Sequence, residues 1–233
     1  DVFSVADTVS KSAGGTFDGN ITAAGTITVT GNADLNGDLD VDGTTNLDAV
    51  DVDGAVNFAA DVTFADGADI ITASAGTSNF RAGVNAGNSI ASGGNYNVTI
   101  GDEAGTAIST GDNNVAVGYN ALATNSTAST NIAVGYQAAY SNVTGVGLTA
   151  FGANTLYATT ASDNCGIGTD NPGNYAAALE SNTLGRFNTA IATGALGSDT
   201  RGSKSTAIGH STLSAQNFAS ATDVFNTAVG YNA

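Results

Sequence analysis

The sequence contains no Met, no Trp, one Pro, one Cys and one His among its 233 residues. The single cysteine, Cys165, excludes an intrachain disulfide. We expect it to be a small buried hydrophobic residue rather than a reactive thiol. The single histidine, His210, would have to serve any Ser-His-Asp triad or histidine-based metal site. Because it stands where other copies of a repeat carry tyrosine, we interpret it as an aromatic-like spacer.

Basic residues are also scarce, because five Lys and Arg stand against 21 Asp and Glu, for a net charge of −16. Residues 1–72 hold thirteen Asp and one Lys, so most of the negative charge lies there. This balance disfavours nucleic acid as a partner, since phosphates require Lys and Arg. It also disfavours adsorption to anionic lipid without bridging divalent cations. No apolar run approaches the length of a membrane span.

One short motif, Asn-Val-Ala-Val-Gly-Tyr-Asn-Ala at 114–121, recurs along the chain. Close copies begin at Asn131, Thr206 and Asn226. Aligned on the glycine position, strong and weak copies fall at 101, 118, 135, 152, 168, 192, 209 and 230. The commonest step is 17 residues, and we expect the longer steps of 24 and 21 to carry loops. Self-similarity at such a period predicts a solenoid.

Each copy has the pattern of a short strand. Val115 and Val117 alternate with a small residue, which is the period-2 pattern of a strand with one buried face. The following Gly118 permits a positive φ or the close approach of a neighbouring coil. The apolar share of 42% is carried largely by Ala and Val, so the core must be thin. We therefore predict an all-β, elongated β-helix or β-solenoid with a β-roll of about 17-residue repeats over 96–233.

A tighter repeat occupies 21–72. Apolar residues six apart, with Gly or Ala two residues later, give the unit apolar-x-apolar-x-Gly-x of hexapeptide β-helices. Three units per coil would give one chain little more than two coils, too few to bury a continuous core. We therefore predict an acidic shaft in which three chains intertwine as a homotrimer. Residues 1–20 are interpreted as a connector and 73–95 as a Gly/Ser/Asn-rich joint. Because the chain begins at Asp1 and ends on a bare repeat, we expect it to be a piece of a longer chain.

The candidate metal site is Asp38, Asp40 and Asp42, which start a D-x-D-x-D-G calcium loop. The position for the bidentate acid at the end of that loop is Ala49. Alternating Asp also fits the solvent face of an alternating strand. Because Leu39 and Val41 also fit the hexapeptide phase, the solvent-face interpretation explains more, calcium is the second interpretation, and we expect no other cofactor.

The candidate ligand-binding residues are Tyr119, Tyr136 and Tyr231, which occupy equivalent places and should form a stripe. Exposed aromatic stripes bind sugar faces, whereas buried ones only pack, and packing is the expectation here. A glycosidase needs two carboxylates about 5–10 Å apart. Glu103 and Glu180 lie in different coils, and Asp163, Asp170 and Asp199 stand near the longer steps without further distinction. The stretch 201–205 holds the only local pair of positive charges and is interpreted as a solvated loop.

The copies Asn-x-Ala-Val-Gly-Tyr and Thr-Ala-Ile-Gly resemble the head repeats of trimeric autotransporter adhesins, which form a trimeric left-handed β-roll. They resemble even more the same repeats in bacteriophage tail fibres and related virion fibre proteins. The resemblance covers roughly residues 20–233 and rests on low-complexity motifs. The period here is longer than in adhesin heads, so we expect a larger coil or a longer turn.

This resemblance implies a structural fibre segment on a virion surface, outside the cell, and not an enzyme. The implied role is that of a spacer that presents a receptor-binding tip three times. The implied partners are two further copies, other virion proteins and a host surface glycan or protein. Nucleic-acid binding and membrane insertion are not expected. A bacterial surface adhesin and a tailspike-like polysaccharide depolymerase are the alternatives.

Overall fold

The structure is a computed structural model of the 233-residue chain, and it describes residues 56, 59, 72, 74–170 and 176–233. The predicted connector at 1–20 lies outside the described residues. The hexapeptide stretch at 21–72 also lies outside them, apart from the three single positions. Asp38, Asp40 and Asp42 are among the residues not described, so the calcium site stays a prediction.

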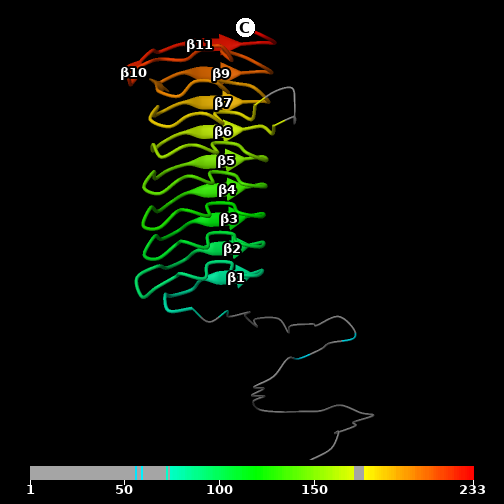
Figure 1. Cartoon of the computed structure of the whole chain (residues 1–233), viewed down its shortest axis with the longest axis vertical. Helices are drawn as coiled ribbons and strands as arrows, with labels where there is room; N and C mark the ends of the chain where they lie inside the picture. The colour runs from blue at the N-terminus through cyan, green and yellow to red at the C-terminus, as the bar shows by residue number, and fades with distance from the viewer. Residues whose placement is uncertain (1–55, 57–58, 60–71, 73, 171–175) are drawn as a thin grey trace, which may run out of the picture. The chain divides into compact units, whose positions relative to one another are not determined.

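The described part of the chain is a β-solenoid in which short strands stack one above another (Figure 1). It contains no helix, and its main sheet has nine parallel strands. These are β1 (Phe80–Ala82), β2 (Val98–Ile100), β3 (Val115–Val117), β4 (Ile132–Val134), β5 (Thr149–Phe151), β6 (Cys165–Ile167), β7 (Thr189–Ile191), β9 (Thr206–Ile208) and β11 (Thr227–Val229). The predicted all-β solenoid is thereby confirmed.

Each strand pairs with the strand of the next coil, so equivalent residues of successive repeats lie side by side. Ala116 of β3, for example, pairs with Ala133 of β4. Strand β1 lies in the stretch interpreted as a joint and pairs with β2 in the same sheet. Two further strands, β8 (Gly202–Ser203) and β10 (Thr222–Asp223), form a separate parallel pair in the C-terminal coils. The step of 21 residues thus carries extra strand structure in place of a plain loop.

From β2 to β9, the middle residue of each three-residue strand is small, and it lies on the buried face. The middle residue of β3, Ala116, is completely buried, while Val115 and Val117 on either side are only half-buried. In every main-sheet strand from β2 to β9 the middle residue is buried, and the residues on either side are half-buried or exposed. The interior is narrow at this position, because it holds Ala in most strands, Gly166 in β6 and, as its largest residue, Thr99 in β2.

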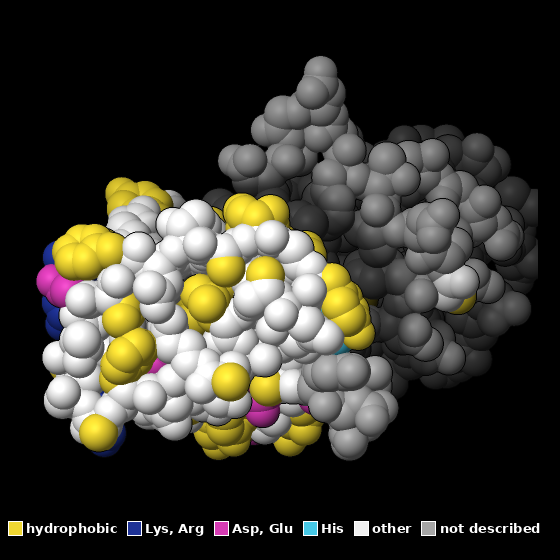
Figure 2. Space-filling view, turned by 90° about the horizontal axis from the view of Figure 1, so that it is seen from above, with side chains coloured by type: hydrophobic (Ala, Val, Ile, Leu, Met, Phe, Trp, Pro, Cys, Tyr) yellow, Lys and Arg dark blue, Asp and Glu magenta, His cyan; other side chains and the backbone are white. Residues whose placement is uncertain are grey.

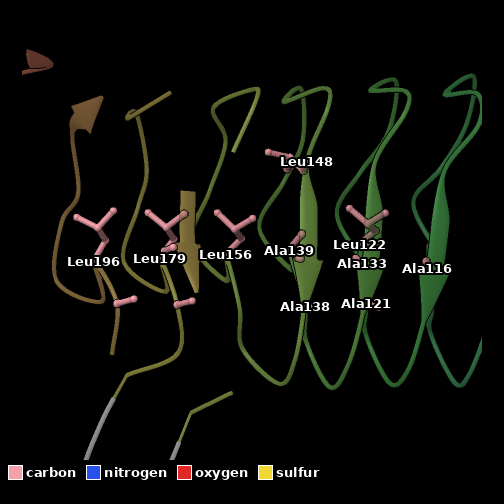
Figure 3. Packing of buried hydrophobic residues seen from close by; sticks show 14 of the residues in the cluster. Ala116, Ala121, Leu122, Ala133, Ala138, Ala139, Leu148, Leu156, Leu179 and Leu196 are labelled. Atoms are coloured by element: carbon pink, nitrogen blue, oxygen red, sulfur yellow. The ribbon is translucent and has the colours of Figure 1, made fainter. Parts of the chain in front are cut away.

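Leucine fills the rest of the core from the turn that follows each strand. Leu122, Leu156, Leu179 and Leu196 occupy the same place in their coils and form one row, with Ala139 at that place in the β4 coil (Figure 3). All five are completely buried. The buried hydrophobic residues of the described part are therefore Ala, Leu and Ile, whereas the composition points to Ala and Val.

The glycine after each strand is required by the stacking of the coils. Gly118 has a φ of 122°, and a Cβ at this position would lie 2.6 Å from the carbonyl oxygen of Gly135 in the next coil. Real carbon–oxygen contacts are never so short, so a side chain would push the coils apart. The exception in this row is Ala192, which adopts a φ of 95°.

Asparagine side chains run through the interior beside the core, one residue before the strands. Asn97 and Asn114 are completely buried. The Nδ2 of Asn97 donates to the Oδ1 of Asn79 (3.1 Å) and to the carbonyl oxygen of Gly111 (2.8 Å). Asn114 repeats both contacts one coil later, to Asn97 and Ala128. These amides satisfy buried backbone groups that the sheet leaves without a partner.

Candidate interaction surface

The outward face of the main sheet is the candidate functional surface, and we call it the sheet face. It consists of the first and third residues of each strand, because successive side chains of a strand point to opposite sides. The third position from β2 onwards holds Ile100, Val117, Val134, Phe151, Ile167, Ile191, Ile208 and Val229. In-register pairing makes this an unbroken column of branched and aromatic side chains along the solenoid.

The sheet face is open to solvent in the single chain. Phe151 is 55% exposed and Ile132 is 44% exposed, although both belong to regular parallel strands. Parallel sheets are normally covered on both faces. Here the inner face is covered by the solenoid's own core and the outer face by nothing within the described residues. The sheet face is thus a large apolar surface of the kind that marks an interaction site.

The free Cys165 belongs to the sheet face as the first residue of β6. It is half-buried and pairs with Thr149 and Thr189 of the adjoining strands. Burial raises the pKa of its thiol. The expectation of a buried hydrophobic residue is therefore met only in part, since the side chain sits on the outer face and not in the core.

The predicted tyrosine residues lie at the corner that follows the strands. Tyr119 and Tyr136 stack on each other, with ring centroids 5.6 Å apart and planes at 15°. Tyr231 stacks instead on His210 at 5.1 Å. Between these pairs the corner carries Ala153, Thr169 and Thr193, so the stripe is interrupted. The interpretation of His210 as an aromatic-like spacer agrees with this stacking.

These rings are exposed, in contrast to the expectation that they pack. Tyr136 is 51% exposed and Tyr231 is 71% exposed. Because stacked rings cover each other's faces, the pair of Tyr119 and Tyr136 offers mainly ring edges and the two end faces. Ligand binding by the three tyrosines stays a prediction. Viewed down the stack, hydrophobic side chains form separate groups on the described part of the chain (Figure 2).

The acidic residues considered for catalysis lie in separate local contacts. Glu103 Oε1 accepts from Asn85 Nδ2 at 2.6 Å, and Glu180 Oε2 accepts from the backbone N–H of Ala177 at 2.6 Å. Asp170 accepts a hydrogen bond from Asn154, Asp163 is exposed and Asp199 is buried. Within the described ranges, no three His, Cys, Asp or Glu side chains are grouped as metal ligands.

No family model, curated protein or solved structure matches the chain. A search of the described residues for a membrane-spanning helix found none of sufficient length and apolarity.

Sequence reasoning found the strands but not the surface they present. The alternation of Val115, Ala116 and Val117 indicates two faces without saying which is buried. The signal was present in the size of the middle residue, which is Thr99, Ala116, Ala133, Ala150, Gly166, Ala190 or Ala207 in successive strands from β2 to β9. A position that never exceeds threonine in size while its neighbours vary from Thr to Phe is the one facing a narrow interior.

Proposed function

We propose that this chain is a segment of a homotrimeric virion fibre, and that three copies associate through the sheet face. The observation that carries the proposal is the continuous apolar column on that face. Burial of apolar surface stabilises association by about 25 cal/mol per Å². A column that repeats in every coil adds this term many times over the length of the solenoid.

The sheet face suits another copy of the same chain. It carries no formal charge from β2 to β9, since its first and third positions hold only Val, Ile, Thr, Phe and Cys. Apolar faces free of charge are typical of obligate interfaces between identical subunits. The chain's net charge of −16 opposes association, so a face without charge is where copies approach at least cost.

The sequence favours three copies over two. The hexapeptide pattern at 21–72 offers one apolar wall per chain and too few residues for a closed coil. Three such walls close a prism around a common axis. The solenoid supplies one sheet face per chain, so three chains would bring three such faces together.

A trimer of this kind serves as a spacer and as a means of host attachment. Stacked coils bonded along their length resist bending and leave few sites for proteolysis. Threefold presentation raises the avidity of a weak surface contact without any new contact. The assignment to a virion draws on the resemblance of the Asn-x-Ala-Val-Gly-Tyr copies to tail fibre repeats and on the acidic balance. The receptor would be a host surface glycan or protein.

Of the two alternatives, a bacterial adhesin fits the described residues as well as a virion fibre does, and a polysaccharide depolymerase fits them less well. A bacterial surface adhesin would use the same sheet face and the same trimer, and a signal peptide, lipid anchor or membrane β-barrel in its gene would distinguish it from a virion fibre. A depolymerase predicts release of reducing sugar from a host polysaccharide. In the described part of the chain, the carboxylates of Glu103, Glu180 and Asp170 accept hydrogen bonds from different residues, and no hydrogen bond links two of them as a pair for glycoside hydrolysis.

Two substitutions test whether the sheet face is the trimer interface: each introduces a glutamate, one on the sheet face and one outside it. Ile132→Glu puts a carboxylate on the sheet face, and Val143→Glu puts one outside the sheet at a residue of nearly the same exposure, 44% against 42%. We expect Ile132→Glu to yield monomers in sedimentation velocity, because three buried carboxylates would repel one another. Val143→Glu should sediment as the parent trimer. Dissociation by both variants, or by neither, would contradict the sheet face as the interface.

A further inference from the structure

We propose that a groove on the C-terminal coils binds a carboxylated sugar and that Arg201 pairs with the carboxylate. This inference deepens the host-attachment part of the proposed function and rests on it for its biological role. The groove has a volume of about 540 Å³, which lies within the usual range for small-molecule sites. It is lined by Thr183, Thr200, Arg201, Asn217, Phe218 and Ala219, which come from three successive coils.

The groove lies where the basic residues of an acidic chain gather. Three of the five Lys and Arg, namely Arg186, Arg201 and Lys204, fall within 19 residues of sequence. Lys204 forms the one salt bridge among the described residues, to Asp223 at 2.7 Å, and lies 4.9 Å from the ring centroid of Phe225. In Figure 2 the visible atoms of Lys and Arg lie along one side of the outline.

Arg201 forms no salt bridge within the described residues, although its backbone N–H donates to the Oδ1 of Asp199 at 3.2 Å. Asp199 is close in sequence, but it is 1% exposed. Its Oδ1 accepts from the backbone N–H of Gly202 at 2.8 Å, and its Oδ2 accepts from the side chain of Gln216. Those donors already stabilise the buried carboxylate. An anion in the groove would thus meet the guanidinium without competition from an exposed Asp or Glu that lines it.

The guanidinium of Arg201 is held in position across the groove. Its Nη1 donates to the carbonyl oxygen of Ala219 in the next coil, at 3.1 Å. A guanidinium has five N–H donors in a rigid fork, and this contact uses one. The remaining donors can pair with both oxygens of a carboxylate, a geometry that favours arginine over lysine.

The other lining residues offer what a sugar requires. The Oγ1 of Thr183 donates to the carbonyl oxygen of Thr200 at 3.0 Å, and the Oγ1 of Thr200 donates to the Oδ1 of Asn217 at 2.8 Å. Both hydroxyl oxygens keep lone pairs for sugar hydroxyls, and Asn217 keeps its two Nδ2 hydrogens. Phe218 adds an apolar surface for the C–H face of a pyranose ring. Arginine, hydroxyls and an aromatic ring together favour a uronic or sialic acid over a neutral sugar.

The experiment titrates two probes into the purified chain by isothermal calorimetry: trigalacturonate and 3′-sialyllactose, each beside its methyl ester. We expect the free acid of at least one probe to bind, and its ester to bind at least tenfold more weakly. Arg201→Gln should weaken the binding of that acid about tenfold, as loss of a bidentate charge-assisted pair does. Phe218→Ala should weaken the acid and its ester alike.

Arg81→Gln is the control for the charge change, because Arg81 lies in the coil of β1, away from the groove; this variant also alters the hydrogen bond from Arg81 Nε to the carbonyl oxygen of Ala86. We expect this variant to bind within twofold of the parent chain. Circular dichroism and the melting temperature show whether each variant is folded. Binding of neither acid, equal binding of acid and ester, or an equal loss in Arg81→Gln and Arg201→Gln would overturn the proposal.

Sedimentation of the same samples separates this proposal from the proposed function. A trimer that binds neither acid overturns the groove site and leaves the fibre assignment standing. A monomer that binds a free acid through Arg201 keeps the groove site and overturns the trimeric fibre.

Discussion

Asn97 and Asn114 are joined through a single oxygen atom inside the solenoid. The Oδ1 of Asn97 accepts from the backbone N–H of Asn114 at 2.9 Å and from its Nδ2 at 3.1 Å. The Oδ1 of Asn114 in turn accepts from the backbone N–H of Asn131 at 3.1 Å. Each amide thus fixes the residue that enters the next strand. This column sets the register of the coils and thereby aligns the sheet face.

Replacing one asparagine of this column should lower the free energy of unfolding more than a substitution at the surface does. Asn114→Ala leaves the backbone N–H of Asn131 and the carbonyl oxygen of Ala128 without that side-chain partner in a dry interior. We expect a loss of about 2–4 kcal/mol in the free energy of unfolding, measured by guanidinium denaturation. Thr127→Ala, an exposed substitution in the same coil, should change it by about 0.5 kcal/mol or less. Similar losses in the two variants would contradict a structural role for the column.

In the row of glycine positions after the strands, we expect two substitutions to change the free energy of unfolding in opposite directions. Gly118→Ala places a methyl group 2.6 Å from the carbonyl oxygen of Gly135 at a positive φ, so we expect a loss of roughly 2 kcal/mol or more. Ala192→Gly relieves a φ of 95° but adds freedom to the unfolded chain. Because the relief of strain outweighs this added freedom, we expect the free energy of unfolding to rise by up to about 1 kcal/mol. Thermal melts of both variants give the comparison, and a clear loss of stability in Ala192→Gly would show that the row tolerates a side chain.

Cys165 reports directly on whether the sheet face is covered. In a trimer assembled through that face, we expect a thiol reagent such as Ellman's reagent to react at least tenfold more slowly than with the dissociated Ile132→Glu chain. Equal rates in the trimer and in the dissociated chain would place Cys165 outside the interface. This outcome would count against the sheet face even if the trimer itself persisted.

The pH dependence of the same reaction follows from the raised pKa of this thiol. The thiolate is the reacting form, and at neutral pH a raised pKa leaves less of it in the folded chain than in the unfolded chain. The folded chain should therefore react more slowly, and the difference should narrow as the pH rises through the folded pKa. A rate profile identical to that of the denatured chain would contradict the burial of Cys165.

The solenoid was predictable because its signal is repeated. Aligning the glycine positions from 101 to 230 reveals the period even though single copies, such as Cys165-Gly-Ile-Gly168, are degenerate. The first coil was missed because Phe80-Arg81-Ala82-Gly83 carries Arg at the middle position, where the other copies carry Thr, Ala or Gly. Tertiary pairing with β2 makes these residues a strand in spite of a weak local pattern.

The surfaces were harder to predict, because a single strand does not reveal its orientation. Val117 and Ala116 are both apolar, and only the width of the coil decides which one is buried. The groove at Arg201 required contacts among residues 17 and 18 apart in sequence, such as Thr200 with Asn217 and Arg201 with Ala219. Such contacts depend on the length of each coil at that place, which the neighbouring residues alone do not give.

The native mass of the chain in solution tests the central claim, that this solenoid is one third of a fibre. Light scattering of the purified chain should give three times its mass of 22.7 kDa, independent of dilution. The same measurement with a chelator examines Asp38, Asp40 and Asp42, since dissociation on chelation would indicate a structural cation there. A trimer that survives chelation shows that its association needs no structural cation. A stable mass of 22.7 kDa would contradict the trimer and leave a single-chain solenoid with an exposed apolar face.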